Sequence, residues 1–241
     1  MTHSLPRLPA IALVITWAAS LFSTPLIALE VNLTEFRPFL EFSVDGQQYR
    51  IERIQDTSNV LSGGFTKTSR PCPPFCIHPM LASPGVETFG EIEVLEFLRT
   101  KVATGKGSLV DARTPSWHKK GTIPGAVNIP FTVFADPDPE NEKLWGTLQS
   151  LGVVRKQPNT SFKDSLKSVL GFFGQSDIEE SKVFDFSNAQ SLLLFCNGPW
   201  CDQSPRAIKG LRKIGYPAEK LHYYRGGIQN WLIMGLTTVK P

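Results

Sequence analysis

Short apolar segments alternate with amphipathic segments over the second half of the chain. Three apolar runs have the length and composition of strands buried on both faces of a sheet: residues 108–111, 191–195 and 221–224. Three further segments predict helices: residues 91–100, 204–214 and 228–234. Because strands alternate with helices, we predict an α/β fold with a central parallel sheet and helices on both faces.

The part of the chain before residue 85 has a different pattern of apolar and polar residues. Residues 41–51 predict two strands around an Asp45-Gly46 turn, which is a strong hairpin signal. The proline-rich run 70–80 follows, and its prolines exclude a regular helix or a central strand. We therefore predict an N-terminal extension, residues 29–84, that contains a small β-hairpin and a loop. The α/β domain is predicted to occupy residues 85–241.

The first 28 residues are typical of a secretory signal peptide. Arg7 precedes an uncharged apolar stretch at 8–22, and the first acidic residue is Glu30, as expected for an n-region and an h-region. We therefore expect an exported protein that is periplasmic or secreted. An uncleaved anchor stays open as an alternative, because residues 8–29 are nearly long enough to span a bilayer. Membrane contact is expected only through that segment.

Composition limits the remaining function classes. The chain of 241 residues has 41% hydrophobic residues, with 25 basic against 22 acidic side chains, and this balance gives no argument for nucleic-acid binding. In an oxidising compartment the four cysteines are candidates for disulfides. The pairs close in sequence are Cys72–Cys76 and Cys196–Cys201, although loop geometry can forbid either bond.

The run 191–206 carries the clearest chemical signal. An apolar strand ends at Cys196, and a short loop leads to a helix start with Ser204 as the expected N-cap and Pro205 at the first helical position. Loop amides and a helix N-terminus stabilise a thiolate. We therefore predict a reactive Cys196, with Arg206 as a source of positive charge. The loop that surrounds it consists of Asn197, Gly198, Pro199, Trp200, Cys201 and Asp202.

Five motifs, in order, resemble those of the rhodanese (sulfurtransferase) family. They are LVDARTP (109–115), GTIPGAVNIP (121–130), LLFC (193–196), GYP (215–217) and GGIQNW (226–231). The resemblance covers about residues 86–236. Thr122 stands where the family usually has histidine, and the long distance from Pro130 to Cys196 indicates an insertion at about 156–188. An amphipathic stretch within it, residues 162–173, predicts a short helix that covers the core or acts as a lid.

The resemblance implies one rhodanese domain in which Cys196 forms a persulfide. The thiolate would take sulfur from a sulfane-sulfur donor and pass it to a thiol or protein acceptor, without a cofactor. Asp111 and Arg113 are expected to give structural support, because buried carboxylates hold loops together.

The loop departs from the family pattern in ways that affect the substrate. Many members that use thiosulfate carry a basic residue late in this loop, where this chain has Cys201 and Asp202. An acid disfavours a dianionic donor, so thiosulfate:cyanide turnover is expected to be weak. A phosphatase of related fold needs Cys-x5-Arg, and the sixth residue after Cys196 is Asp202, which excludes that activity.

Two alternatives from another class stay open at this point. Cys201 could resolve an oxidised Cys196 into a disulfide, which would make the protein a thiol-disulfide redox module. Alternatively, four soft or borderline ligands within nine residues suit copper: Cys72, Cys76, His78 and Met80. The competing interpretation of that loop is a local Cys72–Cys76 disulfide in a rigid proline turn.

Overall fold

The computed structural model describes residues 31–72, 74–156 and 183–241. The predicted signal segment and the amphipathic stretch at 162–173 lie outside the described residues. In the part of the chain that is described, no helix is both long enough and apolar enough to cross a membrane.

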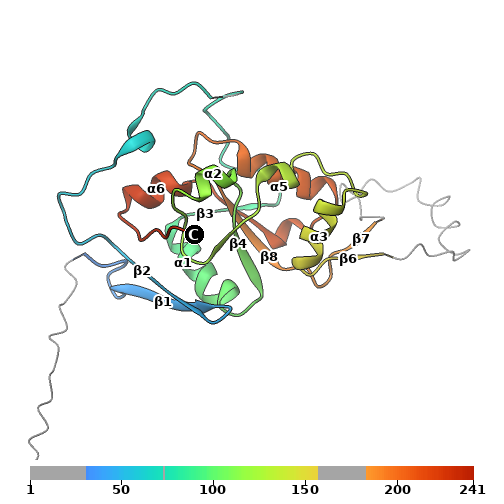
Figure 1. The fold of residues 1–241 in the computed structure, drawn as a ribbon, viewed down its shortest axis with the longest axis horizontal. Coiled ribbons are helices and arrows are strands. Elements are labelled where there is room, and N and C mark those ends of the chain that lie inside the picture. The colour runs from blue at the N-terminus through green and yellow to red at the C-terminus, as the bar shows by residue number, and fades with distance from the viewer. Residues whose placement is uncertain (1–30, 73, 157–182) are drawn as a thin grey trace, which may run out of the picture.

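The central feature is a five-stranded parallel sheet with the strand order β3-β9-β8-β4-β5. Its strands are β3 (Glu87–Phe89), β4 (Gly107–Asp111), β5 (Ala126–Asn128), β8 (Ser191–Phe195) and β9 (Leu221–Tyr224). The three strands predicted from apolar runs form its centre, in the order β9-β8-β4 (Figure 1). The parallel α/β architecture predicted from the sequence is therefore confirmed.

The side chains of each central strand alternate between two separate cores. In β8, Leu192 and Leu194 belong to one core, whereas Leu193 and Phe195 belong to the other. The first core is covered by α3 (Glu142–Ser150) and α5 (Gln203–Lys213), and the second by α1 (Glu91–Phe97) and α6 (Gly227–Ile233). This alternation is why apolar residues follow one another without interruption in the middle of β8.

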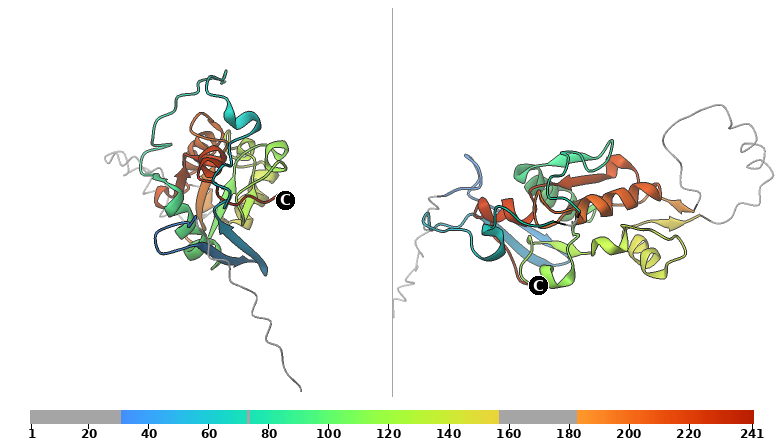
Figure 2. Two further views of the ribbon diagram at one scale, coloured as in Figure 1. Left: turned by 90° about the vertical axis from the view of Figure 1, so that its left-hand side faces the viewer. Right: turned by 90° about the horizontal axis from the view of Figure 1, so that it is seen from above.

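Short elements complete the domain. A π-helical turn at Leu98–Val102 continues α1, and the four-residue helix α2 (Pro115–His118) follows β4. Single 3-10 turns lie at Gly63–Thr66, Phe131–Val133 and Ala218–Lys220. The strands β6 (Val154–Arg155) and β7 (Phe184–Asp185) pair antiparallel and bracket the expected insertion. Figure 2 shows this pair at the end of the molecule opposite the N-terminal hairpin.

The hairpin predicted around Asp45-Gly46 is confirmed as β1 (Phe39–Val44) and β2 (Gln47–Glu52). Asp45 and Gly46 both have positive φ, at 49° and 81°, as a two-residue hairpin turn of type I′ requires. Leu40, Phe42 and Ile51 of the hairpin are buried in the second core, together with residues of α1 and α6.

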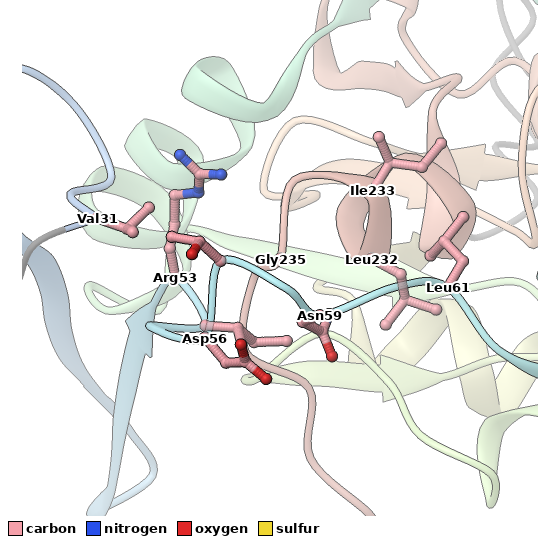
Figure 3. A pocket seen from close by; sticks show the side chains of 10 residues that line it. Val31, Arg53, Asp56, Asn59, Leu61, Leu232, Ile233 and Gly235 are labelled. Carbon is pink, nitrogen blue, oxygen red and sulfur yellow. The ribbon is translucent and has the colours of Figure 1, made fainter.

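The extension is also attached to the C-terminal segment behind α6. Ile54 donates its backbone N–H to Gly235 at 2.7 Å, and the Arg53 Nε donates to the Met234 carbonyl at 2.8 Å. A pocket of about 330 Å³ lies along this seam, between residues 53–61 and the end of α6 (Figure 3). The hairpin and the segment 53–61 that follows it are thus packed on the α/β domain.

Candidate active site

Cys196 lies directly after the central strand β8, at the carboxyl end of the sheet. In open α/β sheets this edge is where ligands bind. The neighbouring strands β4 and β9 end beside it, because Phe195 is in register with both Asp111 and Tyr224. Cys196 is only 2% exposed. The sheet therefore holds its backbone rigidly and removes most of the water from its sulfur.

Hydrogen-bond donors converge on that sulfur. The Ser204 hydroxyl donates to the Cys196 Sγ at 3.1 Å. Burial alone would raise the pKa of the Cys196 thiol. Hydrogen bonds lower it by more, and they come from the Cys201 thiol, the Ser204 hydroxyl and the backbone N–H groups of Ser204 and Gly198. Together they hold the pKa of Cys196 below its ordinary value, because hydrogen bonds to the charged form favour that form. The site is built to hold a thiolate.

The role of Ser204 differs from the sequence-based expectation. The helix α5 begins at Gln203, with Asp202 at the N-cap position, so Ser204 is not the cap. Pro205 occupies the third helical position rather than the first. It is still tolerated there, because the N–H groups of a first helical turn have no partner within the helix. The Ser204 hydroxyl turns toward Cys196 instead of capping the helix.

Cys201 is the second buried thiol of the site. It is 5% exposed, and the structure holds both Cys196 and Cys201 as free thiols, so the candidate disulfide between them is not formed. Its hydrogen bond to Cys196 and its burial raise the pKa of Cys201 far above the ordinary value. Cys201 therefore keeps its proton, while the Cys196 Sγ lies 3.3 Å from the Cys201 backbone carbonyl, to which it donates when it is protonated. This arrangement favours a donor role for Cys201 over attack on an oxidised Cys196.

The loop between the two thiols is shaped by a tight turn. The Cys201 N–H donates to the Gly198 carbonyl at 3.0 Å, and Pro199 stands at the second position of this turn, which its fixed φ suits. Asn197 is 3% exposed, and its side-chain oxygen has no hydrogen-bond partner. The turn directs the Gly198 N–H toward the sulfur.

The start of α6 clamps the other side of the loop. Ile228 and Gln229 donate their backbone N–H groups to the carbonyls of Cys196 and Asn197, at 3.0 and 2.9 Å. This approach requires glycine at Gly227, which has a φ of +56°, and where an added Cβ would meet the Cys196 carbonyl oxygen. The GGIQNW segment thus fixes the active-site loop from behind.

Trp200 and Arg206 make their side-chain contacts with residues other than Cys196. The indole N–H of Trp200 donates to the Gln229 side-chain oxygen, and the guanidinium of Arg70 lies 3.9 Å from the centre of the Trp200 ring. The half-exposed Arg206 lies over Phe131, 4.8 Å from its ring centre, and 4.0 Å from the Asp202 carboxylate. Its guanidinium is therefore at ion-pair distance from Asp202.

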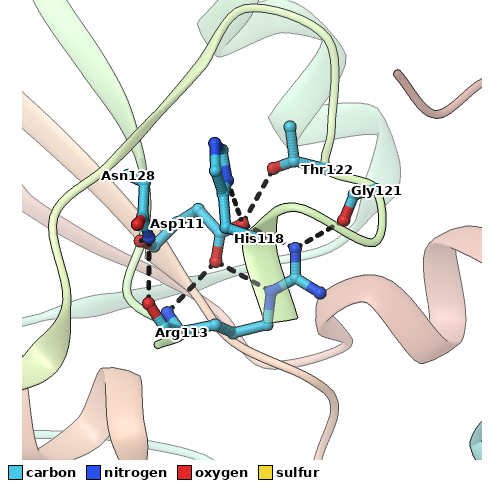
Figure 4. Close-up of polar contacts among 6 residues, drawn as sticks. All are labelled: Asp111, Arg113, His118, Gly121, Thr122 and Asn128. Carbon is cyan, nitrogen blue, oxygen red and sulfur yellow. Dashed lines mark hydrogen bonds and ion pairs between the residues drawn. The ribbon is translucent and has the colours of Figure 1, made fainter. Parts of the chain in front are cut away.

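Asp111 and Arg113 form the buried support that the sequence predicts. Both Asp111 oxygens accept from Arg113, at 2.8 Å from Nε and 2.6 Å from Nη2. Thr122 Oγ1 and His118 Nδ1 bind the same carboxylate at 2.8 and 2.9 Å (Figure 4). These partners hold the pKa of Asp111 below its usual value despite burial, with Arg113 the largest contributor. The network fixes the loop after β4 beside the active-site loop.

His118 was missed by the sequence analysis. Thr122 stands where the family usually has histidine, and both Thr122 and His118 reach the carboxylate of Asp111 (Figure 4). The only sequence signal was a histidine four residues before Thr122, within a helix too short to predict. Gln229 was missed as well, because its contact with Trp200 joins segments far apart in the chain.

The Cys72 loop forms the local disulfide. Cys72 and Cys76 are bonded to each other, with their Cα atoms 5.1 Å apart. Their sulfurs are therefore not thiolates available to a metal, which argues against the copper-binding alternative. Among the described residues, no group of three or more His, Cys, Asp or Glu side chains is placed to hold a metal ion. His78 instead packs beside Arg225, which donates to its carbonyl at 3.1 Å.

A family model described as a rhodanese-like domain matches residues 94–234. A human single-domain sulfurtransferase, TSTD1, is 20% identical, with 63% of this chain and 97% of that chain covered at a TM-score of 0.33. The Saccharomyces cerevisiae single-domain sulfurtransferase RDL2 is also 20% identical, with 62% and 91% covered at a TM-score of 0.35. The curated proteins gave no match.

Proposed function

The chain belongs to the rhodanese-like domain family, and on this premise we propose that it is a sulfurtransferase that carries sulfane sulfur as a persulfide on Cys196. The observation that carries the proposal is the set of donors around one buried sulfur at the end of β8. A thiolate, and not a thiol, is the nucleophile in sulfur chemistry. Here the fold supplies the conditions that keep Cys196 ionised.

In the loading step the Cys196 thiolate attacks the outer sulfur of a donor R–S–SH. A bond forms between the two sulfurs while the donor's S–S bond breaks, which leaves Cys196–S–SH and the donor thiolate R–S⁻. In the unloading step an acceptor thiolate attacks the outer sulfur of Cys196–S–SH and takes it as a persulfide, and Cys196 returns to a thiolate. The sulfur moves at one oxidation level, so neither step needs an external oxidant or reductant.

The loop composition supports a donor other than thiosulfate. Asp202 stands at the N-cap of α5, and Arg206 lies 4.0 Å from its carboxylate. A dianion that approaches this end of the loop would therefore meet a carboxylate whose neighbouring cation is already paired. Hydropolysulfides, small persulfides and persulfidated proteins carry at most one negative charge on the sulfur chain, against two on thiosulfate, and we expect them to load Cys196 faster than thiosulfate does.

We also propose that the protein works after export, in the periplasm or outside the cell. The charge pattern of residues 1–28 supports export. The Cys72–Cys76 bond is consistent with it, because disulfides persist in oxidising compartments. Separation of compartments followed by intact-mass analysis tests this proposal: loss of the first residues and one disulfide are expected, and a full-length reduced protein in the cytoplasm would contradict it.

A single-turnover experiment tests the transfer activity. The protein is incubated with inorganic polysulfide, desalted, and mixed with dithiothreitol while the released sulfide is measured. One equivalent of sulfide is expected from the wild type and from Cys201→Ser, and none above background from Cys196→Ser. Equal release from Cys196→Ser would refute the assignment of the site. The same protocol with thiosulfate is expected to load much less sulfur.

A further inference from the structure

The N-terminal extension covers the outer side of the active-site loop. The Gln229 side-chain amide donates to the Phe65 carbonyl at 3.0 Å, and its oxygen accepts from Trp200. Arg70 stacks on the other part of Trp200, 3.9 Å from the ring centre. In Figure 1 the extension, drawn in blue to cyan, runs around the side of the molecule on which α6 lies, and Phe65 packs 6.2 Å from the Trp117 ring of α2. A segment that lies outside the family's matched region thus contacts the active-site loop directly.

A groove of about 630 Å³ lies between the extension and the loop. Its walls include the apolar side chains of Leu61, Phe65, Ile77 and Trp200, and its charged residues are Lys67 and Arg70. Among the described residues that line it, none carries a carboxylate. The groove therefore combines apolar walls with positive charge, which complements a ligand that is both apolar and acidic.

Large apolar side chains stand exposed along residues 75–81, and Ile77 of this run lines the groove. Phe75 is 71% exposed, Ile77 91%, Met80 65% and Leu81 57%. Exposed apolar side chains that gather in one stretch commonly mark a surface that binds a partner. The Cys72–Cys76 bond and the neighbouring prolines limit the motion of this run, so less conformational entropy is lost when a partner binds. The exposed run extends beyond the groove, which favours a protein segment over a small molecule.

The groove is close to the reacting sulfur. Gly198 donates its backbone N–H to Cys196, and a Cβ added to Gly198 would lie 3.0 Å from both the Trp200 nitrogen and the Gln229 oxygen. Trp200 and Gln229 therefore rest on the residue that cradles the sulfur, and they form the floor of the groove. A segment bound in the groove lies over the active-site loop.

The geometry points to a docking surface for the sulfur acceptor: the groove and residues 75–81 bind a segment of a partner protein that presents apolar side chains flanked by carboxylates. This inference rests on the proposed function. The partner's cysteine thiolate then attacks the outer sulfur of Cys196–S–SH. The Cys196 S–S bond breaks, the partner leaves as a persulfide, and Cys196 keeps the negative charge.

The test uses two synthetic peptides with one central cysteine between leucines, flanked by glutamates in one and by lysines in the other. The full-length protein is loaded with polysulfide, and sulfur transfer to each peptide is followed by mass spectrometry. The acidic peptide is expected to react about tenfold faster, as one to two charge pairs would give. Thiol chemistry alone predicts the opposite order, because glutamates raise a thiol pKa and lysines lower it.

Two variants test whether the preference for the acidic peptide comes from the groove and residues 75–81. Lys67→Glu and Ile77→Ser are expected to remove most of it, whereas Lys106→Glu, the same charge change at a distant exposed lysine, leaves it intact. Transfer to dithiothreitol is expected to stay at the wild-type rate in all three. If the wild type reacts faster with the acidic peptide and Lys67→Glu retains that difference, the docking surface is overturned. Equal rates of the wild type with the two peptides would overturn it as well.

The outcomes separate this inference from the function itself. If polysulfide does not load Cys196, the proposed function fails. If Cys196 loads and transfers to dithiothreitol, but the acidic peptide has no advantage, only the docking surface fails. If mercaptoacetate shows the same dependence on Lys67 as the acidic peptide does, the groove recognises small anionic thiols, and the inference of a protein partner is wrong.

Discussion

Removal of the Ser204 hydroxyl tests how the fold makes Cys196 a thiolate. Ser204→Ala deletes the donor that lies 3.1 Å from the Cys196 sulfur, while the Ser204 backbone N–H, the Gly198 N–H and the Cys201 thiol remain. A hydrogen bond to a charged group contributes about 1.5–3 kcal/mol, and one pKa unit corresponds to about 1.4 kcal/mol. The pKa of Cys196 is therefore expected to rise by about 1–2 units.

The sign of the effect sets the pH range in which it appears. Because the folded protein holds the pKa of Cys196 below its ordinary value, the thiolate persists as the pH falls to that lowered pKa. In Ser204→Ala the thiolate is lost at a higher pH, so the variant and the wild type differ most between the two midpoints. Above both midpoints both proteins are fully ionised, and the variant is expected to react faster there, because the nucleophilicity of a thiolate rises with its pKa.

The rate of alkylation by iodoacetamide, measured from pH 4 to 10, gives the midpoint directly. Peptide mass mapping assigns the adduct to Cys196 rather than to Cys201. Ser191→Ala, a serine at the opposite end of β8, is the matched control and is expected to keep the wild-type midpoint. A midpoint of Ser204→Ala that equals or lies below the wild-type value, in a variant that folds normally by circular dichroism, would refute the donor role of Ser204.

Three further changes test other parts of the site. Cys201→Ala is expected to raise the pKa of Cys196, whereas Cys201→Ser retains a donor and shifts it less; the same alkylation profile measures both. Asp111→Asn leaves Arg113 buried without a counter-charge and is expected to lower the free energy of unfolding by about 3–5 kcal/mol in urea titration; a change below about 1 kcal/mol would contradict its structural role. Gly227→Ala, at a φ of +56° against the Cys196 carbonyl, is expected to cost about 1–3 kcal/mol of stability and to slow sulfur loading, measured by urea titration and sulfide release.

The central strands could be predicted because both faces of the sheet are buried. Residues 191–195 and 221–224 are mostly apolar, and the structure places strands at the same bounds. The strands β3 and β5 lie at the sheet edges, have three residues each, and are only partly buried. Their side chains lack the apolar signal that a sequence pattern detects, so these strands were not predicted.

The position of Cys196 at the end of a central strand could also be predicted from the sequence, but the contacts of its neighbours could not. Asp202 and Ser204 are both good helix caps, and the pattern alone does not say which one occupies that position. The structure gives the position to Asp202 and directs Ser204 to the sulfur. The contact of Phe65 with Gln229 joins residues 164 positions apart, and no local pattern reports such a contact.

The measurement that tests the central claim most directly is peptide-level mass spectrometry of the full-length protein after incubation with inorganic polysulfide. The account predicts the mass of one additional sulfur atom on the peptide that contains Cys196, removed by dithiothreitol, present in Cys201→Ser and absent in Cys196→Ser. Additional sulfur on Cys201 alone, or no sulfur on Cys196 with several sulfane-sulfur donors, would contradict it.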